Sequence, residues 1–228
     1  MDTINSKQNN TLLIGGIFIA SLFYPVLGHQ IFLGFKITET TFLYSRLFFW
    51  LWVFILYFYA HKVEHTDFLL WKDKPYKFSY YVASVIILYL LCIACGIISV
   101  IPKILGWHEH NELIIAIKSL LSKNMPLLIF SAITAGITEE LIFRGYLVPR
   151  LELLFKNKFM PVIISAFMFA VMHYKYRSMS ELIFTFTFGI LFAIHYQKYR
   201  NIKILMITHA VVDLISFFLY RELQPHLH

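Results

Sequence analysis

Charged side chains are scarce in this sequence. Asp, Glu, Lys and Arg make up 14% of the 228 residues, while 59% are hydrophobic. A soluble domain would carry about 25% charged residues. The composition therefore predicts one integral membrane domain over residues 1–228 and leaves no room for a second, soluble domain. It also lacks a basic segment interleaved with aromatic residues, so we expect no nucleic-acid partner.

Cysteine is almost absent as well. Cys92 and Cys95 are the only two, and both lie within an apolar run. A thioredoxin-like Cys-x-x-Cys pair would belong to a soluble βαβ unit, for which the sequence has no pattern. Buried free cysteines behave as small hydrophobic side chains. We therefore expect no redox or metal-binding role for this pair.

Long apolar runs dominate what is present. They predict an all-α, polytopic transmembrane helix bundle, because each run approaches the ~20 residues needed to cross a bilayer. The seven predicted spans are 11–34, 42–60, 79–101, 126–148, 159–173, 181–197 and 202–220. The stretch 109–122 alternates polar and apolar residues at helical spacing. It is typical of an amphipathic helix on the membrane surface, or it forms an eighth, partly inserted helix.

Lysine and arginine are unevenly distributed between the predicted loops. The side that holds the N-terminus carries eleven: Lys7, Lys62, Lys72, Lys74, Lys77, Arg150, Lys156, Lys158, Lys198, Arg200 and Lys203. The other side carries seven: Lys36, Lys103, Lys118, Lys123, Lys175, Arg177 and Arg221. Because cytoplasmic loops are enriched in lysine and arginine, the bias favours a cytoplasmic N-terminus. The compact, Phe- and Ile-rich chain suits a bacterial cytoplasmic membrane.

Three ionisable side chains interrupt the apolar run 125–148: Glu139, Glu140 and Arg144. Facing lipid, they would together cost on the order of 8–10 kcal/mol. Glu140 and Arg144 are four residues apart and share a helix face, which predicts an ion pair. Glu139 is rotated by about 100° from Glu140. We therefore expect Glu139 to stay free for chemistry.

Two more pairs with four-residue spacing follow on later spans. Phe169 and His173 end the fifth predicted span. His209 and Asp213 lie within the seventh. Each pair shares one helix face, and ionisable residues within membranes face the bundle interior. We therefore predict that Glu139, His173 and His209 line one wet cavity.

The predicted cavity favours hydrolysis by activated water. A carboxylate near two imidazoles can act on water as a general base, and donors aimed at a developing oxyanion stabilise a tetrahedral intermediate. No serine or cysteine nucleophile with a matching base is evident. Two histidines and a carboxylate also suit zinc with an open position, which makes Glu139, His173 and His209 the candidate ligands. Because Arg144 adds positive charge nearby, we favour catalysis without a cofactor.

In order and spacing these residues resemble the CPBP family of intramembrane proteases, also called the Abi or type II CAAX prenyl endopeptidase family. The family pattern is Glu-Glu-x-x-x-Arg, then Phe-x-x-x-His, then His-x-x-x-Asn or Asp. The matching residues are Glu139, Glu140, Arg144, Phe169, His173, His209 and Asp213. The resemblance covers a protease-like core at about 120–220 and implies a helical membrane bundle with an interior catalytic cavity.

The resemblance also implies a role for each residue. Glu139 is the base, assisted by His173, while His209 and Asp213 hold the carbonyl oxygen of the substrate. The supporting residues are Glu140, Arg144 and Phe169. The implied activity is an intramembrane endopeptidase, of glutamic or metallo type, that cleaves a membrane-associated protein or peptide.

Two other classes of function remain open. Intramembrane Glu, His and Asp also build the proton relays of transporters, although this sequence has no internal repeat of the kind found in many carriers. A non-catalytic membrane binding or immunity protein would keep the same bundle. Asp213 stands where the prenyl-protein branch of the family has Asn, and an ionised Asp cannot donate to an oxyanion. The resemblance in bacteria implies peptide maturation, bacteriocin self-immunity or the processing of surface proteins.

Overall fold

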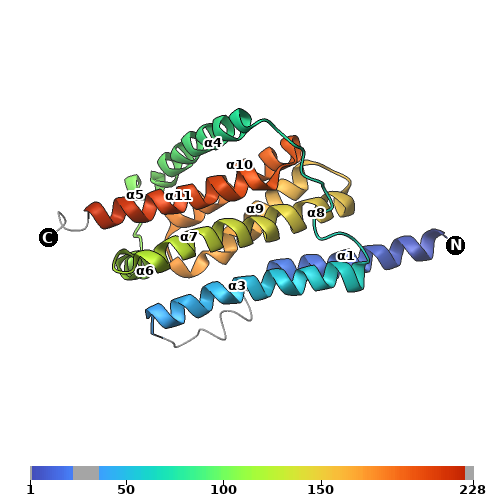
Figure 1. The fold of residues 1–228 in the computed structure, drawn as a ribbon, viewed down its shortest axis with the longest axis horizontal. Helices are drawn as coiled ribbons and strands as arrows, with labels where there is room; N and C mark the ends of the chain where they lie inside the picture. The colour runs from blue at the N-terminus through green and yellow to red at the C-terminus, as the bar shows by residue number, and fades with distance from the viewer. Residues whose placement is uncertain (1, 23–35, 224–228) are drawn as a thin grey trace.

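The computed structural model describes residues 2–22 and 36–223. Within these ranges the chain is helical and contains no strand, so the predicted all-α fold is confirmed. The long helices lie side by side (Figure 1). The α-helices of the described residues are α1 (Asp2–Leu22), α3 (Glu39–Tyr59), α4 (Phe78–Ser99), α5 (Ile101–Ile104), α6 (Glu112–Ser122), α7 (Met125–Glu140), α8 (Val148–Phe155), α9 (Phe159–Met172), α10 (Met179–Tyr199) and α11 (Ile202–Leu223).

Five helical stretches in the described residues are long and apolar enough to cross a membrane. They are Glu39–Glu64, Phe78–Ile104, Met125–Phe155, Met179–Tyr199 and Ile202–Leu223, and each contains one of the predicted spans. Shorter apolar helices, Asn10–Leu22 and Phe159–Met172, stand where the other two spans were expected. The predicted span 11–34 also extends into residues 23–35, which lie outside the described residues. The chain is therefore an integral membrane bundle, but the count of seven spans is not confirmed.

The amphipathic helix expected at 109–122 is present as α6, which begins at Glu112 and ends at Ser122. It packs against α7 and α11. Glycine and proline do not interrupt it, and its apolar side chains recur at helical spacing, so one face can pack on the bundle. This helix becomes a wall of the cavity described below.

The bundle has two distinct ends (Figure 1). α5, α6 and the last turns of α11 lie at one of them, called the α6 end here, and α8 and the first turns of α1 lie at the opposite, α8 end. At the α6 end, the Asn124 side chain donates to Glu39 at 2.7 Å and joins the starts of α7 and α3. At the α8 end, the backbone N–H of Lys74 donates to the carbonyl of Arg200 at 2.8 Å. These contacts group the loops by end without any assumption about the number of crossings.

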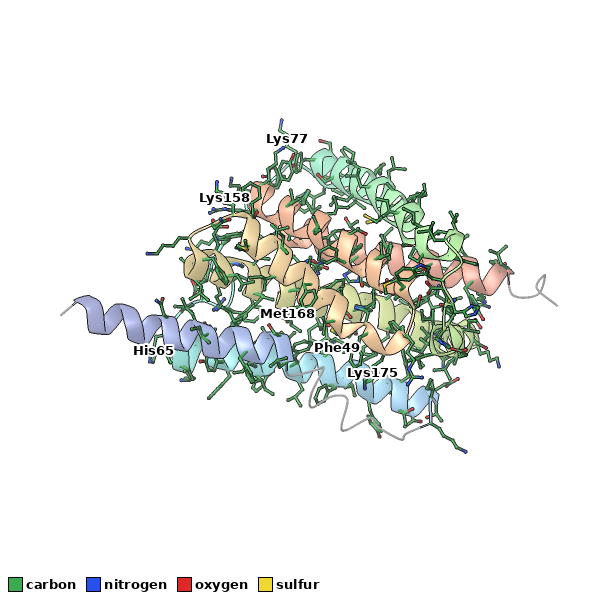
Figure 2. The ribbon with its side chains drawn as sticks, turned by 180° about the vertical axis from the view of Figure 1, so that it is seen from behind. Phe49, His65, Lys77, Lys158, Met168 and Lys175 are labelled. Atoms are coloured by element: carbon green, nitrogen blue, oxygen red, sulfur yellow. The ribbon has the colours of Figure 1, made fainter. Side chains whose placement is uncertain are left out.

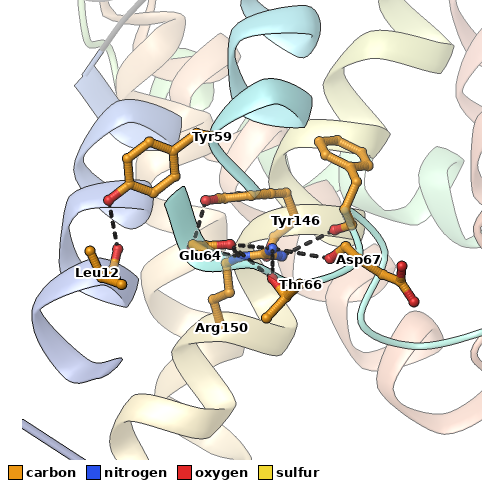
Figure 3. Close-up of polar contacts among 8 residues, drawn as sticks. Leu12, Tyr59, Glu64, Thr66, Asp67, Tyr146 and Arg150 are labelled. Carbon is orange, nitrogen blue, oxygen red and sulfur yellow. Dashed lines mark hydrogen bonds and ion pairs between the residues drawn. The ribbon is translucent and has the colours of Figure 1, made fainter. Parts of the chain in front are cut away.

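A buried ion pair closes the α8 end (Figure 3). The guanidinium of Arg150 donates to the Glu64 carboxylate at 2.6 and 2.8 Å, and both side chains are almost fully buried. The hydroxyl of Tyr146 donates to the same carboxylate at 2.9 Å, and Arg150 also donates to the Phe68 carbonyl at 3.1 Å. Arg150 was predicted to be a loop cation. That prediction was wrong, because the Glu64 carboxylate pairs with Arg150 inside the protein.

Glycine allows α7 and α11 to approach each other closely. A Cβ atom at Gly136 would lie 2.7 Å from the backbone nitrogen of Ala210 and 2.9 Å from the carbonyl oxygen of Met206. Small residues at such crossings let helix backbones meet in membrane bundles. Glu139 and Glu140 follow Gly136 by one turn, and His209 precedes Ala210. This crossing therefore brings the two glutamates next to the histidine.

We predict that Gly136→Ala destabilises the protein. The added methyl group would meet backbone atoms that cannot move alone, and overpacking of this kind costs about 1–3 kcal/mol. Gly96→Ala is the control, because a Cβ there would have nothing within 4 Å. The measurement is the temperature at which detergent-solubilised protein loses its monodisperse peak. Equal melting of the two variants would contradict the tight crossing.

Candidate active site

A cavity of about 190 Å³ lies between α3, α6, α7, α10 and α11. The four predicted catalytic residues all line it: Glu139, His173, His209 and Asp213. They come from α7, from the residue after α9, and from α11. The structure thus places side chains from three separate regions of the sequence around one space inside the bundle.

His209 points one ring nitrogen towards two carboxylates. Its Nε2 atom lies 3.9 Å from Glu139 Oε2 and 3.9 Å from Asp213 Oδ2. Both distances exceed the reach of a hydrogen bond. Glu139 and His209 are buried, whereas the Asp213 side chain is 27% exposed. Asp213 therefore lies at the more solvent-exposed part of the cavity, and Glu139 lies at its buried part.

Glu140 contacts two cationic or polar partners rather than one. Its Oε1 atom accepts from Arg144 Nη1 at 3.0 Å, so the expected ion pair is present, with both side chains fully buried. The same oxygen accepts from His209 Nδ1 at 2.8 Å. The four-residue spacing predicted the contact with Arg144 but not the one with His209. Because a carboxylate oxygen only accepts, this contact puts a proton on Nδ1 and turns Nε2 towards Glu139 and Asp213.

Aromatic rings enclose the Arg144 guanidinium. Its central carbon lies 4.4 Å from the centroid of Phe169, and Phe192 and Phe188 follow at 5.6 and 5.8 Å. Within the described residues, Arg144 Nε and Nη2 have no hydrogen-bond partner. A cation over a ring face gains as much as about 2 kcal/mol when it is desolvated. The rings therefore supply part of the stabilisation that hydrogen bonds to these two nitrogens would have given.

The helix that carries this pair is not a continuous α-helix as predicted for 126–148. It is α-helical to Glu140, π-helical over Leu141–Leu147, and α-helical again from Val148. π-Helical turns are rare and occur frequently at functional sites. This π-helical turn begins immediately after the two glutamates, and Arg144 lies within it.

His173 caps the end of α9. Its Nδ1 atom lies 2.9 Å from the carbonyl oxygen of Phe169. The carbonyl can only accept, so Nδ1 carries the proton and Nε2 keeps a lone pair. The ring also contacts the Phe169 ring edge-on, with centroids 5.0 Å apart, as the four-residue spacing suggested. Phe169 therefore fixes both the tautomer and the orientation of His173.

Three charged residues of the cavity wall were missed by the sequence analysis: Arg46, Lys118 and Glu181. Arg46 lies over the rings of Phe42 and Phe49, each 4.8 Å away. Lys118 donates to the Ser216 hydroxyl at 3.3 Å. A signal was available for Arg46 and Glu181, because both are ionisable residues inside predicted spans. The same feature, an ionisable residue inside a predicted span, identified Glu139 from the sequence.

The candidate zinc ligands do not form a ligand set as placed. Across residues 2–22 and 36–223, no group of three His, Cys, Asp or Glu side chains is close enough to hold a metal ion. His173 directs one nitrogen to Phe169, and His209 directs one to Glu140. Each histidine thus keeps only one ring nitrogen for any further ligand.

Comparison with known proteins supports the resemblance. Residues 121–215 match the family model described as type II CAAX prenyl endopeptidase Rce1-like. The match begins at the end of α6 and continues into α11, and it includes all seven residues of the predicted site. The resemblance stated from the motifs is confirmed over this segment. No curated protein and no solved structure matches the chain.

A second polar contact joins two borders of the cavity. The Glu109 carboxylate accepts from the Ser178 hydroxyl at 2.6 Å and from the backbone N–H and hydroxyl of Ser180, both at 3.1 Å. It thereby links the loop before α6 to the first turn of α10. Burial raises the pKa of Glu109, but these hydrogen bonds outweigh burial and hold the pKa below its ordinary value.

We predict that Arg144→Ala lowers the yield and the melting temperature of the protein. Removing one partner of a buried ion pair costs roughly 3–5 kcal/mol, and here it leaves the Glu140 carboxylate with His209 alone. Arg144→Lys keeps the charge but lacks the planar guanidinium group. Its yield and melting temperature should therefore lie between those of the native protein and those of Arg144→Ala. Lys203→Ala, at an exposed position, is the control. Native yield and melting in Arg144→Ala would refute the pairing as a stabilising contact.

We also predict a pH-dependent contribution from Glu109. Because its folded pKa is lowered, its stabilisation is present above the ordinary glutamate pKa of about 4.3 and is lost as pH falls through the lower, folded value. The melting temperature of Glu109→Gln should therefore lie below that of the native chain at neutral pH. The difference should shrink below about pH 4. Glu112→Gln, at an exposed position on the same segment, should show no such difference.

Proposed function

We propose that this protein is an intramembrane endopeptidase that hydrolyses a peptide bond of a membrane-associated protein or peptide. One observation carries the proposal: a single cavity at membrane depth collects Glu139, His173, His209 and Asp213. The family whose model matches residues 121–215 is an endopeptidase family by its description. A binding protein would have no need of a base and an oriented imidazole pair in the same space.

The proposed reaction begins with a water molecule between Glu139 and His173. Glu139 takes a proton from this water, with Nε2 of His173 as the second acceptor, and the hydroxyl attacks the carbonyl carbon of the substrate. In its doubly protonated form, His209 keeps Nδ1–H on Glu140 and offers Nε2–H to the oxyanion. Asp213 Oδ2 lies 3.9 Å from this nitrogen, so its charge favours the proton there without occupying the place of the carbonyl oxygen. The leaving amine then takes the proton from Glu139, which restores the carboxylate.

Glu140 and Arg144 are positioning residues in this scheme. Glu140 orients His209 through Nδ1, and Arg144 pairs with the same carboxylate oxygen inside the protein. Phe169 contacts Arg144 and His173 and holds both in place. This arrangement provides water activation by side chains alone. We therefore propose a metal-independent, glutamic-type enzyme.

The proposed setting is a bacterial cytoplasmic membrane, with the N-terminus in the cytoplasm. Exposed lysine and arginine gather at the α8 end, where α1 also begins. Cytoplasmic segments carry such an excess. The partners of the site are then a membrane-associated substrate and the surrounding lipid.

We predict that Glu139→Gln removes nearly all turnover. The amide keeps the shape of the side chain but cannot accept a proton, and loss of a general base lowers rates by about 10²–10⁴-fold. Purified protein would be reconstituted with a library of lipid-anchored peptides, and cleavage would be read by mass spectrometry. Glu112→Gln is the control. Undiminished cleavage by Glu139→Gln would overturn the enzyme assignment.

We further predict that cleavage survives exhaustive chelation. The same reconstituted enzyme would be assayed after chelator treatment, with its metal content measured in parallel. Zinc bound by protein has ligands at about 2.0–2.2 Å, and a loaded site should appear at one metal ion per chain. Loss of activity that stoichiometric zinc restores would overturn the metal-independent mechanism.

A further inference from the structure

The cavity occupies only one half of the bundle. Its walls come from the first turns of α3 and α10, from α6, and from the last turns of α11, represented by Arg46, Phe184, Lys118 and Ser216. On α7, the lining residue nearest the α8 end is Glu139. Each of these helix parts lies towards the α6 end. The polar space therefore starts at the middle of the bundle and extends towards that end.

The other half of the bundle is sealed. Residues 142–151 after the two glutamates are all buried, and five large side chains among them are at most 1% exposed. They are Ile142, Phe143, Tyr146, Leu147 and Leu151. Beyond them lies the buried pair of Arg150 and Glu64. A peptide or a water chain that came from the α8 end would have to displace this core.

The two ends also differ in charge. Nine exposed lysine and arginine residues lie at the α8 end: Lys62, Lys72, Lys74, Lys77, Lys156, Lys158, Lys198, Arg200 and Lys203. Four exposed ones lie at the α6 end: Lys36, Lys103, Lys123 and Arg177. Figure 2 shows His65, Lys77 and Lys158 towards one end of the bundle and Lys175 towards the other. By the positive-inside rule, the α8 end faces the cytoplasm.

From these observations we infer that the cavity is entered from the non-cytoplasmic side, so that the substrate is a peptide segment exposed on that side of the membrane. The nature of the reaction rests on the proposed function, whereas the side of entry rests on packing and charge. The substrate class is then a membrane-anchored protein or peptide whose polar part lies outside the cytoplasm. A cytosolic carboxyl-terminal motif on a prenyl anchor would lie on the sealed side.

Cysteine labelling tests the side of entry without any need for activity. Cys92 and Cys95 are buried and unpaired, so both would be replaced by Ala to give a cysteine-free chain. Single cysteines would then be introduced as Lys77→Cys and Lys203→Cys at the α8 end, and as Lys103→Cys and Arg177→Cys at the α6 end. Ser216→Cys would report on the cavity itself. Spheroplasts would be treated with a membrane-impermeant maleimide before and after permeabilisation.

We expect the two α6-end cysteines and Ser216→Cys to react in intact spheroplasts. The two α8-end cysteines should react only after permeabilisation. The reverse pattern would overturn the inference, and so would labelling of Ser216→Cys only after permeabilisation. Two positions at each end guard against a single variant that fails to fold.

A cleavage assay separates this inference from the proposed function. The lipid-anchored peptide library would be added to spheroplasts and, in parallel, to inverted membrane vesicles. Cleavage in spheroplasts alone, lost in Glu139→Gln, is the expected result, and cleavage in inverted vesicles alone would overturn the side of entry. Absence of cleavage in both would count against the endopeptidase, while the labelling pattern would still decide the side.

Discussion

One carboxylate oxygen, Glu140 Oε1, holds the site together. It accepts from Arg144 within its own helix and from His209 on α11, so it joins the π-helical turn to the neighbouring helix at full burial. Such a contact is strong in low dielectric and equally costly to leave incomplete. The close crossing at Gly136 is needed for it, and the orientation of His209 follows from it. Glu139 lies beside a histidine that Glu140 has already oriented.

Much of this arrangement could be predicted from spacing alone. Apolar runs of membrane length predicted the bundle, and four-residue spacing predicted the contacts of Glu140 with Arg144 and of Phe169 with His173. The contact between Glu140 and His209 could not be predicted in this way. The two residues are 69 positions apart, and only the packing of α7 on α11 decides which face of each helix meets the other. The π-helical turn likewise has no sequence pattern of its own.

Arg150 shows where counting charges misleads. A cation near the end of an apolar run is ordinarily solvated, so Arg150 was assigned to a loop. Glu64, the last residue of the helical stretch that begins at Glu39, instead pairs with it. Arg46, in contrast, carries a signal in the sequence, because it is an ionisable residue inside a predicted span. For Arg150 the decisive fact is which distant segment packs nearby, and a single sequence does not contain that fact.

The sealed half of the bundle has an electrical consequence. A wet cavity that crossed the membrane would conduct protons and collapse the membrane potential, worth about 2.3 kcal/mol per charge for each 100 mV. The buried side chains of Ile142, Phe143, Leu147 and Leu151 fill the half of the bundle beyond the cavity. With the side of entry inferred above, most of the voltage would fall across this packed half rather than across the cavity. The proposed chemistry would then run in an energised membrane without discharging it.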